Sequence, residues 1–237
     1  MKTQLGLFRK GSANLWMSVT CDVTMAQYPN KVDQFSNLNS NLICINLIQS
    51  MDSQFVLRRA DLSDAEALAK LSERTYRETF VEVFCVGYPE KDLICNFRSS
   101  AGPEWFSKTI VDSHQAVWVI EDQTNGELVA YAVVGPAHIN DIPRPDLCSN
   151  LDGALNHLFV QRNCRSRGLG KKLMNVILGW LEEHHPGRPI WLNVWSGNVK
   201  AQKFYTPYGF ITVGEANFPV GEWTDHDFIM KRQPNKV

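Results

Sequence analysis

The stretch LNHLFVQRNCRSRGLG, residues 155–170, decides the fold of this chain. It begins as an apolar, strand-like run at 155–160 and ends in the basic, glycine-containing loop RSRGLG at 165–170, directly before an amphipathic helix. Such a loop leaves several backbone N–H groups unpaired at the helix N-terminus, where the helix dipole adds roughly half a positive charge. Gly168 and Gly170 permit positive φ and close approach of a ligand. The stretch predicts an anion site for a phosphate or pyrophosphate, with a plain strand–turn–helix connection as the alternative.

The pattern on either side of this stretch predicts one α/β domain. Ser63 and Glu66 fit a capping box, and Asn125-Gly126 fits a hairpin turn. The expected elements, in chain order, are a strand at 55–59, a helix from 63 to about 80, a second helix within 90–112 that is interrupted near 102–103, strands at 116–120 and 128–134, a loop at 138–151, the strand and helix around the glycine loop up to about 184, a strand at 189–194, a helix from 197 to about 208, and strands at 210–213 and 227–231. This order indicates a mixed α/β (α+β) fold, with one central sheet that carries helices on both faces.

Residues 1–53 differ in composition from the rest of the chain. They are rich in Ser, Asn and Gln, poor in charge, and show no sustained period, although the apolar run Leu42–Ile48 is compatible with a strand. We expect a flexible extension at 1–53 and a globular domain at 54–233. Met51 stands just before the first well-patterned strand, so a natural start of translation at Met51 stays open.

The composition of the whole chain narrows the function classes. The chain has 237 residues, 44% of them hydrophobic and 21% charged, which predicts a packed globular core. A net charge of −1 argues against bulk attraction to nucleic acid or to an anionic membrane, and no apolar run approaches the ~18 residues of a membrane span. The six cysteines form no CxxC pair, which favours free thiols in a reducing, cytoplasmic compartment over a disulfide framework or a metal site.

A second group of candidate site residues follows the strand at 189–194. Asn198 and Tyr205 are two helical turns apart, so both lie on one helix face, and Trp191 and Trp195 flank the strand. A strand that leads into a pyrophosphate loop, with a second strand followed by Asn and Tyr on a helix, suits an extended nucleotide-containing cofactor. Taken alone, Tyr205 is also compatible with a core aromatic residue and Asn198 with a helix N-cap.

Two blocks of sequence make the resemblance to a family specific. LFVQRNCRSRGLGKKLM resembles the cofactor signature of the GCN5-related N-acetyltransferases (GNAT), in which an apolar strand and [RQ]-x-x-G-x-[GA] open a helix, and NVWSGNVKAQKFYTPYGF resembles their second signature. The resemblance extends from about Phe55 to Arg232. It implies a single GNAT-type domain whose twisted, mixed and mostly antiparallel sheet has six to seven strands. It also implies an acyltransferase that moves the acetyl group of acetyl-CoA to a primary amine by direct attack.

The resemblance implies a role for each matching position. Phe159 and Val160 would offer backbone groups to the pantetheine arm, and Asn198 would hydrogen-bond that arm. Tyr205 would donate a proton to the departing thiolate, a task that suits a phenol that is neutral at pH 7. The pyrophosphate would bind the backbone N–H groups of Arg165, Ser166, Arg167, Gly168, Leu169 and Gly170.

The amine half of the reaction lacks the residue that many family members use. An alkylamine has a pKa of about 10.4, so only about one molecule in 2,000 is neutral at pH 7 and a base is needed. Many relatives place Glu in the strand before the glycine loop, whereas this strand reads ALNH at 154–157. Strand alternation predicts that Asn156, Leu158 and Val160 share one face and that His157 takes the other. We expect Asn156 to hold a catalytic water, while His157 is either a base or a packed residue. Candidate proton acceptors are Glu78, Glu82, Asp141 and bulk solvent.

A further similarity concerns the acceptor. ERTYRETF at 73–80, IWLNVW at 190–195 and the tail at 209–231 are similar to bacterial acetyltransferases that act on spermidine and spermine. A polyamine site is acidic, and we expect Glu78 and Glu82 to bind this substrate. The alternative is that both are solvated surface residues.

Other classes of protein are excluded or stay open. A dinucleotide-binding dehydrogenase needs G-x-G-x-x-G and an acidic residue after the next strand, but this chain offers only Gly168-Leu169-Gly170 and a strand that ends in Asn193-Val194-Trp195. A non-catalytic acetyl-CoA sensor and an acetyltransferase of protein lysines or N-termini stay open. We expect a small-molecule amine as the partner, and neither nucleic acid, membrane nor metal; a homodimer stays open.

Overall fold

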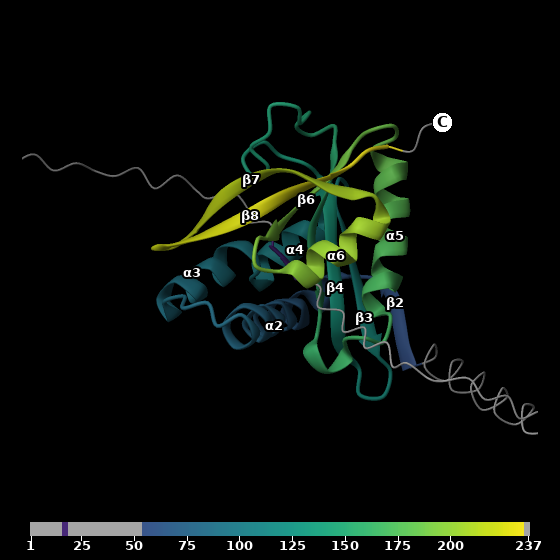
Figure 1. Ribbon diagram of the computed structural model, residues 1–237. Coiled ribbons are helices and arrows are strands. Elements are labelled where there is room, and N and C mark those ends of the chain that lie inside the picture. Colours follow the sequence, from purple (N-terminus) through teal and green to yellow (C-terminus); the bar gives the residue numbers. More distant parts are fainter. Residues whose placement is uncertain (1–15, 19–53, 235–237) are drawn as a thin grey trace, which may run out of the picture.

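The computed structural model describes residues 16–18 and 54–234 (Figure 1). The strands are β1 (Trp16–Ser18), β2 (Phe55–Arg59), β3 (Ala116–Asp122), β4 (Glu127–Pro136), β5 (Gly153–Val160), β6 (Ile190–Trp195), β7 (Phe210–Val220) and β8 (Trp223–Arg232). The helices are α2 (Ala65–Tyr76), α3 (Glu90–Ser100), α4 (Pro103–Val111), α5 (Leu169–His184) and α6 (Val199–Tyr205), with a π-helical segment η2 (Arg77–Val83) and the 3-10 turns η1 (Leu62–Asp64), η3 (Arg162–Cys164) and η4 (Thr206–Tyr208). The predicted strand at Leu42–Ile48 and most of the predicted extension lie outside the described residues.

The sheet is mixed and mostly antiparallel, as predicted. Its seven main strands follow the order β2-β3-β4-β5-β6-β8-β7, and β1 pairs with β5 beside this path. Along the path only β5 and β6 are parallel, which requires the crossover through α5 that the glycine loop begins. The sequence prediction of a six- to seven-stranded mixed sheet is confirmed.

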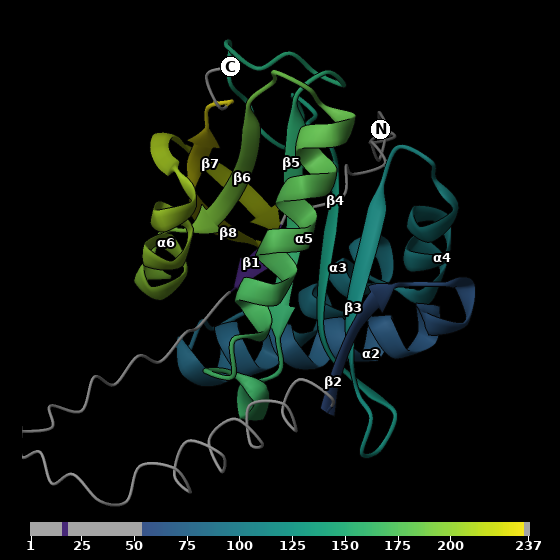
Figure 2. The same cartoon turned by 90° about the vertical axis from the view of Figure 1, so that its right-hand side faces the viewer.

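Helices cover both faces of the sheet. α2, α3 and α4 lie against one face, and α5 and α6 lie against the other (Figures 1 and 2). The apolar stripe of α5, including Leu173 and Ile177, is fully buried in one core cluster. A second cluster packs Leu68 of α2 and Phe106 of α4 against Tyr131 of β4. The sheet is therefore buried on both faces and its strands are held in fixed positions.

β5 and β6 diverge soon after they begin, which creates the β5–β6 opening. They pair only at Gly153 with Ile190 and at Ala154 with Trp191. Beyond these pairs, β1 lies parallel to β5, with Trp16 opposite His157. The backbone of residues 16–18 therefore occupies the edge of β5 that faces the opening (Figure 2).

A β-bulge interrupts β5 at the start of the opening. His157 pairs with Val133 of β4 and Leu155 pairs with Val134, so Asn156 is the extra residue. Leu155 and Leu158 consequently both pack in the core under α5. The predicted alternation is confirmed for Leu158 and Val160, which share one face, and for His157, which takes the other. At Asn156 the bulge interrupts this alternation.

Two local predictions also need correction. The capping box is formed by Asp61 and Asp64 at the start of η1, and not by Ser63 and Glu66: the Asp61 side chain accepts from Ser63 N, and the Asp64 side chain accepts from Asp61 N. The closing strands are also much longer than 210–213 and 227–231. Gly214 and Pro219 obscure the strand pattern of β7, although the backbone pairs with β8 through Val220.

Candidate functional site

The loop before α5 has the geometry of an anion site. Gly168 is the N-cap of α5 and has a left-handed φ of 77°, and Ser166 is also left-handed, with a φ of 63°. No side chain caps the helix, and its first turn carries no acidic residue. The first amides of α5 therefore have no intrahelical acceptor, and the helix dipole favours negative charge in front of them.

The two arginines of the loop brace it. The Nε of Arg165 donates to the backbone oxygen of Val160 over 3.0 Å, and its Nη2 donates to Thr79 Oγ1 over 3.0 Å. The guanidinium of Arg167 lies over the ring of Phe55 at 5.6 Å. These contacts attach the loop to the end of β5, to η2 and to β2. Because both arginine side chains are engaged in this way, the backbone amides of the loop are the main candidates for binding an anion.

Asn198 and Tyr205 lie on α6, directly after β6. Asn198 caps α6, because its Oδ1 accepts from Ala201 N over 3.0 Å, which agrees with the N-cap alternative. Its buried Nδ2, however, has no partner among the described residues. The ring of Tyr205 is fully buried in the core, which agrees with the alternative interpretation as a core aromatic residue. The hydroxyl of Tyr205 also lacks a hydrogen-bond partner within the described part of the chain. Burial raises the pKa of Tyr205, so its phenol is neutral and retains a proton to donate.

Asn156 and His157 of β5 differ in how firmly they are held. The ring of His157 stacks on Trp105 with a centroid distance of 5.1 Å, and its Nδ1 lies 3.4 Å from Tyr131 Oη. This is the packed environment of a structural histidine. Asn156 is half-buried at the bulge, and its Oδ1 has no hydrogen-bond partner in the described ranges. Of the two residues, Asn156 offers the polar atom that a ligand or water can engage.

The two glutamates predicted to bind substrate both pair with arginines. Glu78 is buried, accepts from the backbone N of Arg162 over 2.8 Å, and pairs with Arg74 over 3.1 Å. Glu82 is exposed and pairs with Arg162 over 3.2 Å. Glu78 therefore also fastens η2 to the turn after β5, and neither carboxylate is without a positive partner.

Asp141, a predicted proton acceptor, lies in the loop between β4 and β5. It is buried, and burial raises the pKa of its carboxyl to about 6. Its backbone oxygen accepts from Asn193 Nδ2 of β6 over 2.8 Å, which fixes the loop against the sheet.

Sequence reasoning did not single out Asp225 and Asp227 of β8, two acids that the fold buries almost completely. The signal was present in the stretch TDHDF, because two Asp residues two positions apart share one face of a strand. The strand prediction began only at residue 227 and therefore did not reveal this shared face.

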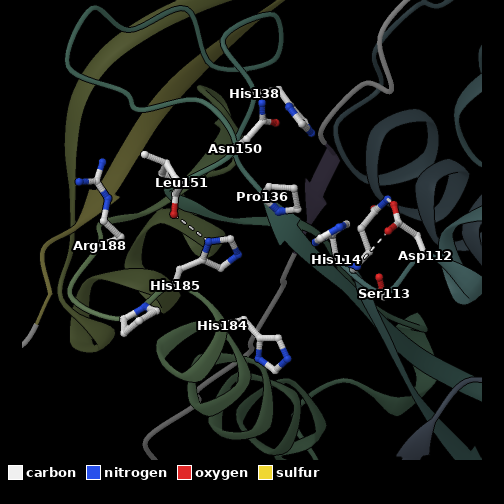
Figure 3. Close-up of a pocket in the computed structure, with 12 residues that line it drawn as sticks. Asp112, Ser113, His114, Pro136, His138, Asn150, Leu151, His184, His185 and Arg188 are labelled. Atoms are coloured by element: carbon white, nitrogen blue, oxygen red, sulfur yellow. Dashed lines mark hydrogen bonds between the residues drawn. The ribbon is translucent and has the colours of Figure 1, made fainter.

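A separate cavity of about 590 Å³ lies at the other end of the sheet (Figure 3). It is lined by the turn between α4 and β3, the end of β4, the loop before β5 and the C-terminus of α5, with His114, His138, His184 and His185 in its wall. His185 Nδ1 lies 2.8 Å from the backbone oxygen of Leu151. Because the glycine loop lies at the opposite ends of β5 and α5, this cavity is distinct from the β5–β6 opening.

The described residues offer neither a cluster of metal ligands nor a helix suited to a membrane. Among the described residues, no group of three or more His, Cys, Asp or Glu side chains could hold a metal ion. Within the same ranges, no helix combines the length and apolar character that crossing a membrane requires.

Comparisons with known proteins agree with this geometry. The chain is 29% identical over 97 residues to a probable spermine N(1)-acetyltransferase from Bacillus subtilis subsp. natto, an alignment that covers 39% of this chain and 59% of that relative. It is 23% identical over 173 residues to an uncharacterized N-acetyltransferase from Mycobacterium tuberculosis, covering 73% of this chain and 99% of the relative.

Solved structures share the fold. An N-acetyltransferase from Thermoplasma acidophilum, crystallised with coenzyme A, superposes with a TM-score of 0.57 at 16% identity, covering 76% of this chain and 98% of the other. The ribosomal-protein alanine N-acetyltransferase from Escherichia coli gives a TM-score of 0.53 at 16% identity, covering 77% and 96%. Residues 75–210 match the Acetyltransferase (GNAT) family, and the chain belongs to this family.

Proposed function

We propose that this protein is an N-acetyltransferase that moves the acetyl group of acetyl-CoA to a primary amine of a small, polyamine-like molecule. The observation that carries the proposal is the β5–β6 opening, which the loop before α5 bounds at one end. Beyond Ala154 the edge of β5 is not paired with β6 and carries only the three-residue strand β1. If a ligand displaces β1, this edge and the uncapped helix N-terminus suit a long ligand with an amide-containing arm and a pyrophosphate.

The residues around the opening fit acetyl-CoA. The backbone amides at 166–170 would hold the pyrophosphate, whereas Arg165 N already donates to Arg162 O over 3.3 Å. The backbone edge at Phe159 and Val160 would pair with the pantetheine arm. The unpartnered Nδ2 of Asn198 is a donor for the same arm. When bound, acetyl-CoA supplies the acetyl group as a reactive thioester.

Tyr205 and Asn156 are proposed to act on protons at the reacting centre. Tyr205 donates its phenolic proton to the departing sulfur, a role that needs a neutral phenol without a competing partner. Asn156 positions the amine or a water through Oδ1, since amide groups accept hydrogen bonds but do not take a proton at neutral pH. The proton that the amine loses passes to such a water and from there to bulk solvent.

A small acceptor is favoured over a protein chain by the contacts on the acceptor side. The turn between β7 and β8 is fastened to α3, because Glu222 N donates to Asp92 Oδ2 over 3.0 Å. Tyr88, which precedes α3, donates to Asp225 of β8. A wide peptide groove would require these elements to stand apart. Glu78 and Glu82 are both paired with arginines. Their contribution to the negative charge of the acceptor side is therefore largely neutralised.

A thiol-release assay with acetyl-CoA and a panel of amines tests the proposal. The panel contains spermidine, 1,4-diaminobutane, amino acids, an aminoglycoside and a peptide with a free lysine and N-terminus. We expect release of coenzyme A with the diamine and polyamine. Turnover with the peptide alone would favour a protein acceptor, and tight acetyl-CoA binding without turnover on any amine would favour a sensor.

A further inference from the structure

Asp225 and Asp227 place two carboxylates on one face of β8. Their exposed fractions are only 1% and 2%. The side chains at 225, 227 and 229 share one face of the strand, and Ile229 of this set packs in a core cluster. The two acids are therefore held inside the molecule by a rigid element.

The hydrogen-bond partners of the Asp225 carboxylate are neutral, and Asp227 lacks such a partner at one oxygen. Tyr88 Oη donates to both oxygens of Asp225, over 2.8 and 2.7 Å, and Trp223 Nε1 donates to Oδ1 over 3.1 Å. Asp227 Oδ1 is buried and has no hydrogen-bond partner in the described part of the chain. Within residues 54–234, no ion pair joins either carboxylate to a basic side chain.

This arrangement is costly for a folded protein. Burial raises the pKa of Asp225 to about 6, and burial together with the charge of Asp225 raises the pKa of Asp227 well above its usual range. Buried acids are normally paired with a basic side chain or a metal, because an unpaired charge in the protein interior loses its hydration without compensation. A pair of acids without such a partner, one of which has an unsatisfied oxygen, points to a cation supplied from outside.

Aromatic rings surround the pair. Tyr88 contacts Trp223 with a centroid distance of 5.7 Å and Tyr76 with a distance of 5.9 Å. Trp195 lies 4.8 Å from Phe84. Aromatic walls suit an alkylammonium group, since the ring faces attract the cation and the apolar surfaces accept the alkyl chain.

The pair also lies next to the β5–β6 opening. Asp227 is the direct cross-strand partner of Trp195, the last residue of β6, so their side chains project from the same face. β6 forms one wall of the opening, and α6, with Asn198 and Tyr205, follows it. A molecule bound at Asp227 can thus extend along the end of β6 toward the proposed acetyl-transfer site.

We infer that Asp225 and Asp227 bind the non-reacting ammonium group of a di- or polyamine acceptor. The inference rests on the proposed acetyl transfer and names the residues that select its substrate class. An ammonium between two carboxylates holds its proton more tightly, so it is a poor nucleophile. The amino group that receives the acetyl must therefore be a different one, and the acceptor must carry at least two.

The matched amines 1,4-diaminobutane and butylamine test this inference, because they differ only in the second amino group. Binding of each amine is measured by calorimetry on the full chain, and kcat/KM is measured with acetyl-CoA. The variants are Asp227→Asn, Asp225→Asn and Glu222→Gln. Glu222 lies on the same hairpin, is exposed and pairs with Lys91, so its variant removes one nearby charge outside the proposed site.

The wild-type chain is expected to prefer the diamine by about tenfold or more, and Asp227→Asn is expected to weaken diamine binding by a similar factor. The preference should stay within about twofold in Glu222→Gln. Equal diamine affinity in wild type and Asp227→Asn, or an equal loss in Glu222→Gln, would overturn the inference. Asp225→Asn provides the same comparison if Asp227→Asn does not fold.

The two proposals fail in different ways. If butylamine is acetylated as well as the diamine, acetyl transfer stands and the assignment of Asp225 and Asp227 is wrong. If no amine is acetylated but the diamine binds in an Asp227-dependent manner, the cation site stands and the proposed transfer is wrong.

Discussion

The two halves of the proposed site are built from different chemistry. The cofactor side uses backbone amides and neutral polar atoms, such as Asn198 Nδ2 and Tyr205 Oη, on elements that directly follow β5 and β6. The acceptor side uses the carboxylates Asp225 and Asp227, which meet residues from the segment before α3. The cofactor side is local in sequence and forms recognisable motifs, whereas the acceptor side joins residues that are 137 positions apart.

Acidic residues within the acceptor side also differ from one another. Glu78 and Glu82 have arginine partners, whereas Asp225 accepts only from neutral groups and Asp227 Oδ1 has no partner in the described part of the chain. A carboxylate that the fold already neutralises stabilises local structure, and a carboxylate left without a cation is available to a charged ligand. Whether an acidic residue has a structural or a binding role therefore depends on its partners in the fold.

Tyr205→Phe is expected to give the largest change in kcat of all the variants. The residue belongs to the cofactor side of the proposed site, so binding of the amine should not change. Loss of the phenolic proton donor should lower kcat by about 100-fold, within the range for general acid catalysis. Acetyl-CoA affinity should stay nearly unchanged because the ring remains in the core. Steady-state kinetics and calorimetry measure the two quantities, and an unchanged kcat would remove Tyr205 from the mechanism.

Gly168→Ala is expected to weaken acetyl-CoA binding by about tenfold, because a left-handed residue with a side chain costs roughly 1–2 kcal/mol. Gly179→Ala is the matched control on the same helix α5, since Gly179 is exposed and an added Cβ there meets no atom within 4 Å. Calorimetric titration with acetyl-CoA compares the variants. Equal affinities would show that the loop geometry does not matter for the cofactor.

Asp227→Asn is expected to stabilise the free protein in a pH-dependent way. The pKa of Asp227 is raised in the folded state, so the native chain loses stability as pH rises from the unfolded-state pKa through this raised value. The variant should gain about 1–3 kcal/mol at pH 8 and almost nothing near pH 3. Thermal unfolding at both pH values measures this gain, and a loss of stability at pH 8 would contradict the account of an unpaired charge.

Removal of residues 1–50 is expected to tighten acetyl-CoA binding by roughly threefold. The backbone of Trp16–Ser18 pairs with the same β5 edge that the pantetheine arm is proposed to use, so the two compete. Calorimetry on the full chain and on a chain that begins at Met51 tests this competition. An equal or weaker affinity of the shorter chain would exclude it.

Glu82→Gln is expected to have the smallest effect. An exposed, arginine-paired carboxylate contributes roughly 0.4 kcal/mol, so KM for 1,4-diaminobutane should change by no more than about twofold. A rise in KM equal to that of Asp227→Asn would restore Glu82 as a substrate-binding residue and weaken the contrast between the two groups of acids.

The parts of the molecule that the sequence predicts well are those governed by local rules. Periodicity predicts the apolar stripe of α5, and Gly209 predicts the end of the helical segment after η4. The same rules predict the order of most strands along the chain. The bulge at Asn156 could not be predicted, because it depends on the register between β4 and β5. Gly214 and Pro219 are unfavourable in strands, so the sequence did not predict the full length of the β7–β8 hairpin. Because the predicted last strand began at residue 227, the shared face of Asp225 and Asp227 was not predicted either.

The partners of charged residues could not be predicted from the sequence either. Glu78 was predicted as a substrate ligand because it is acidic and a polyamine site is expected to be acidic. Its contacts with Arg74 and with the backbone of Arg162 arise from tertiary packing of η2 against the end of β5. A sequence pattern indicates where charge is present, and only the fold shows which charges are already neutralised.

The most direct test of the account is mass spectrometry of the products formed from acetyl-CoA and 1,4-diaminobutane over time. The account predicts that the monoacetylated diamine accumulates and is acetylated again only slowly, because its single remaining amino group cannot be held by Asp225 and Asp227 and react at once. Absence of any acetylated product, or formation of the diacetylated product at a rate similar to that of the first step, would contradict it.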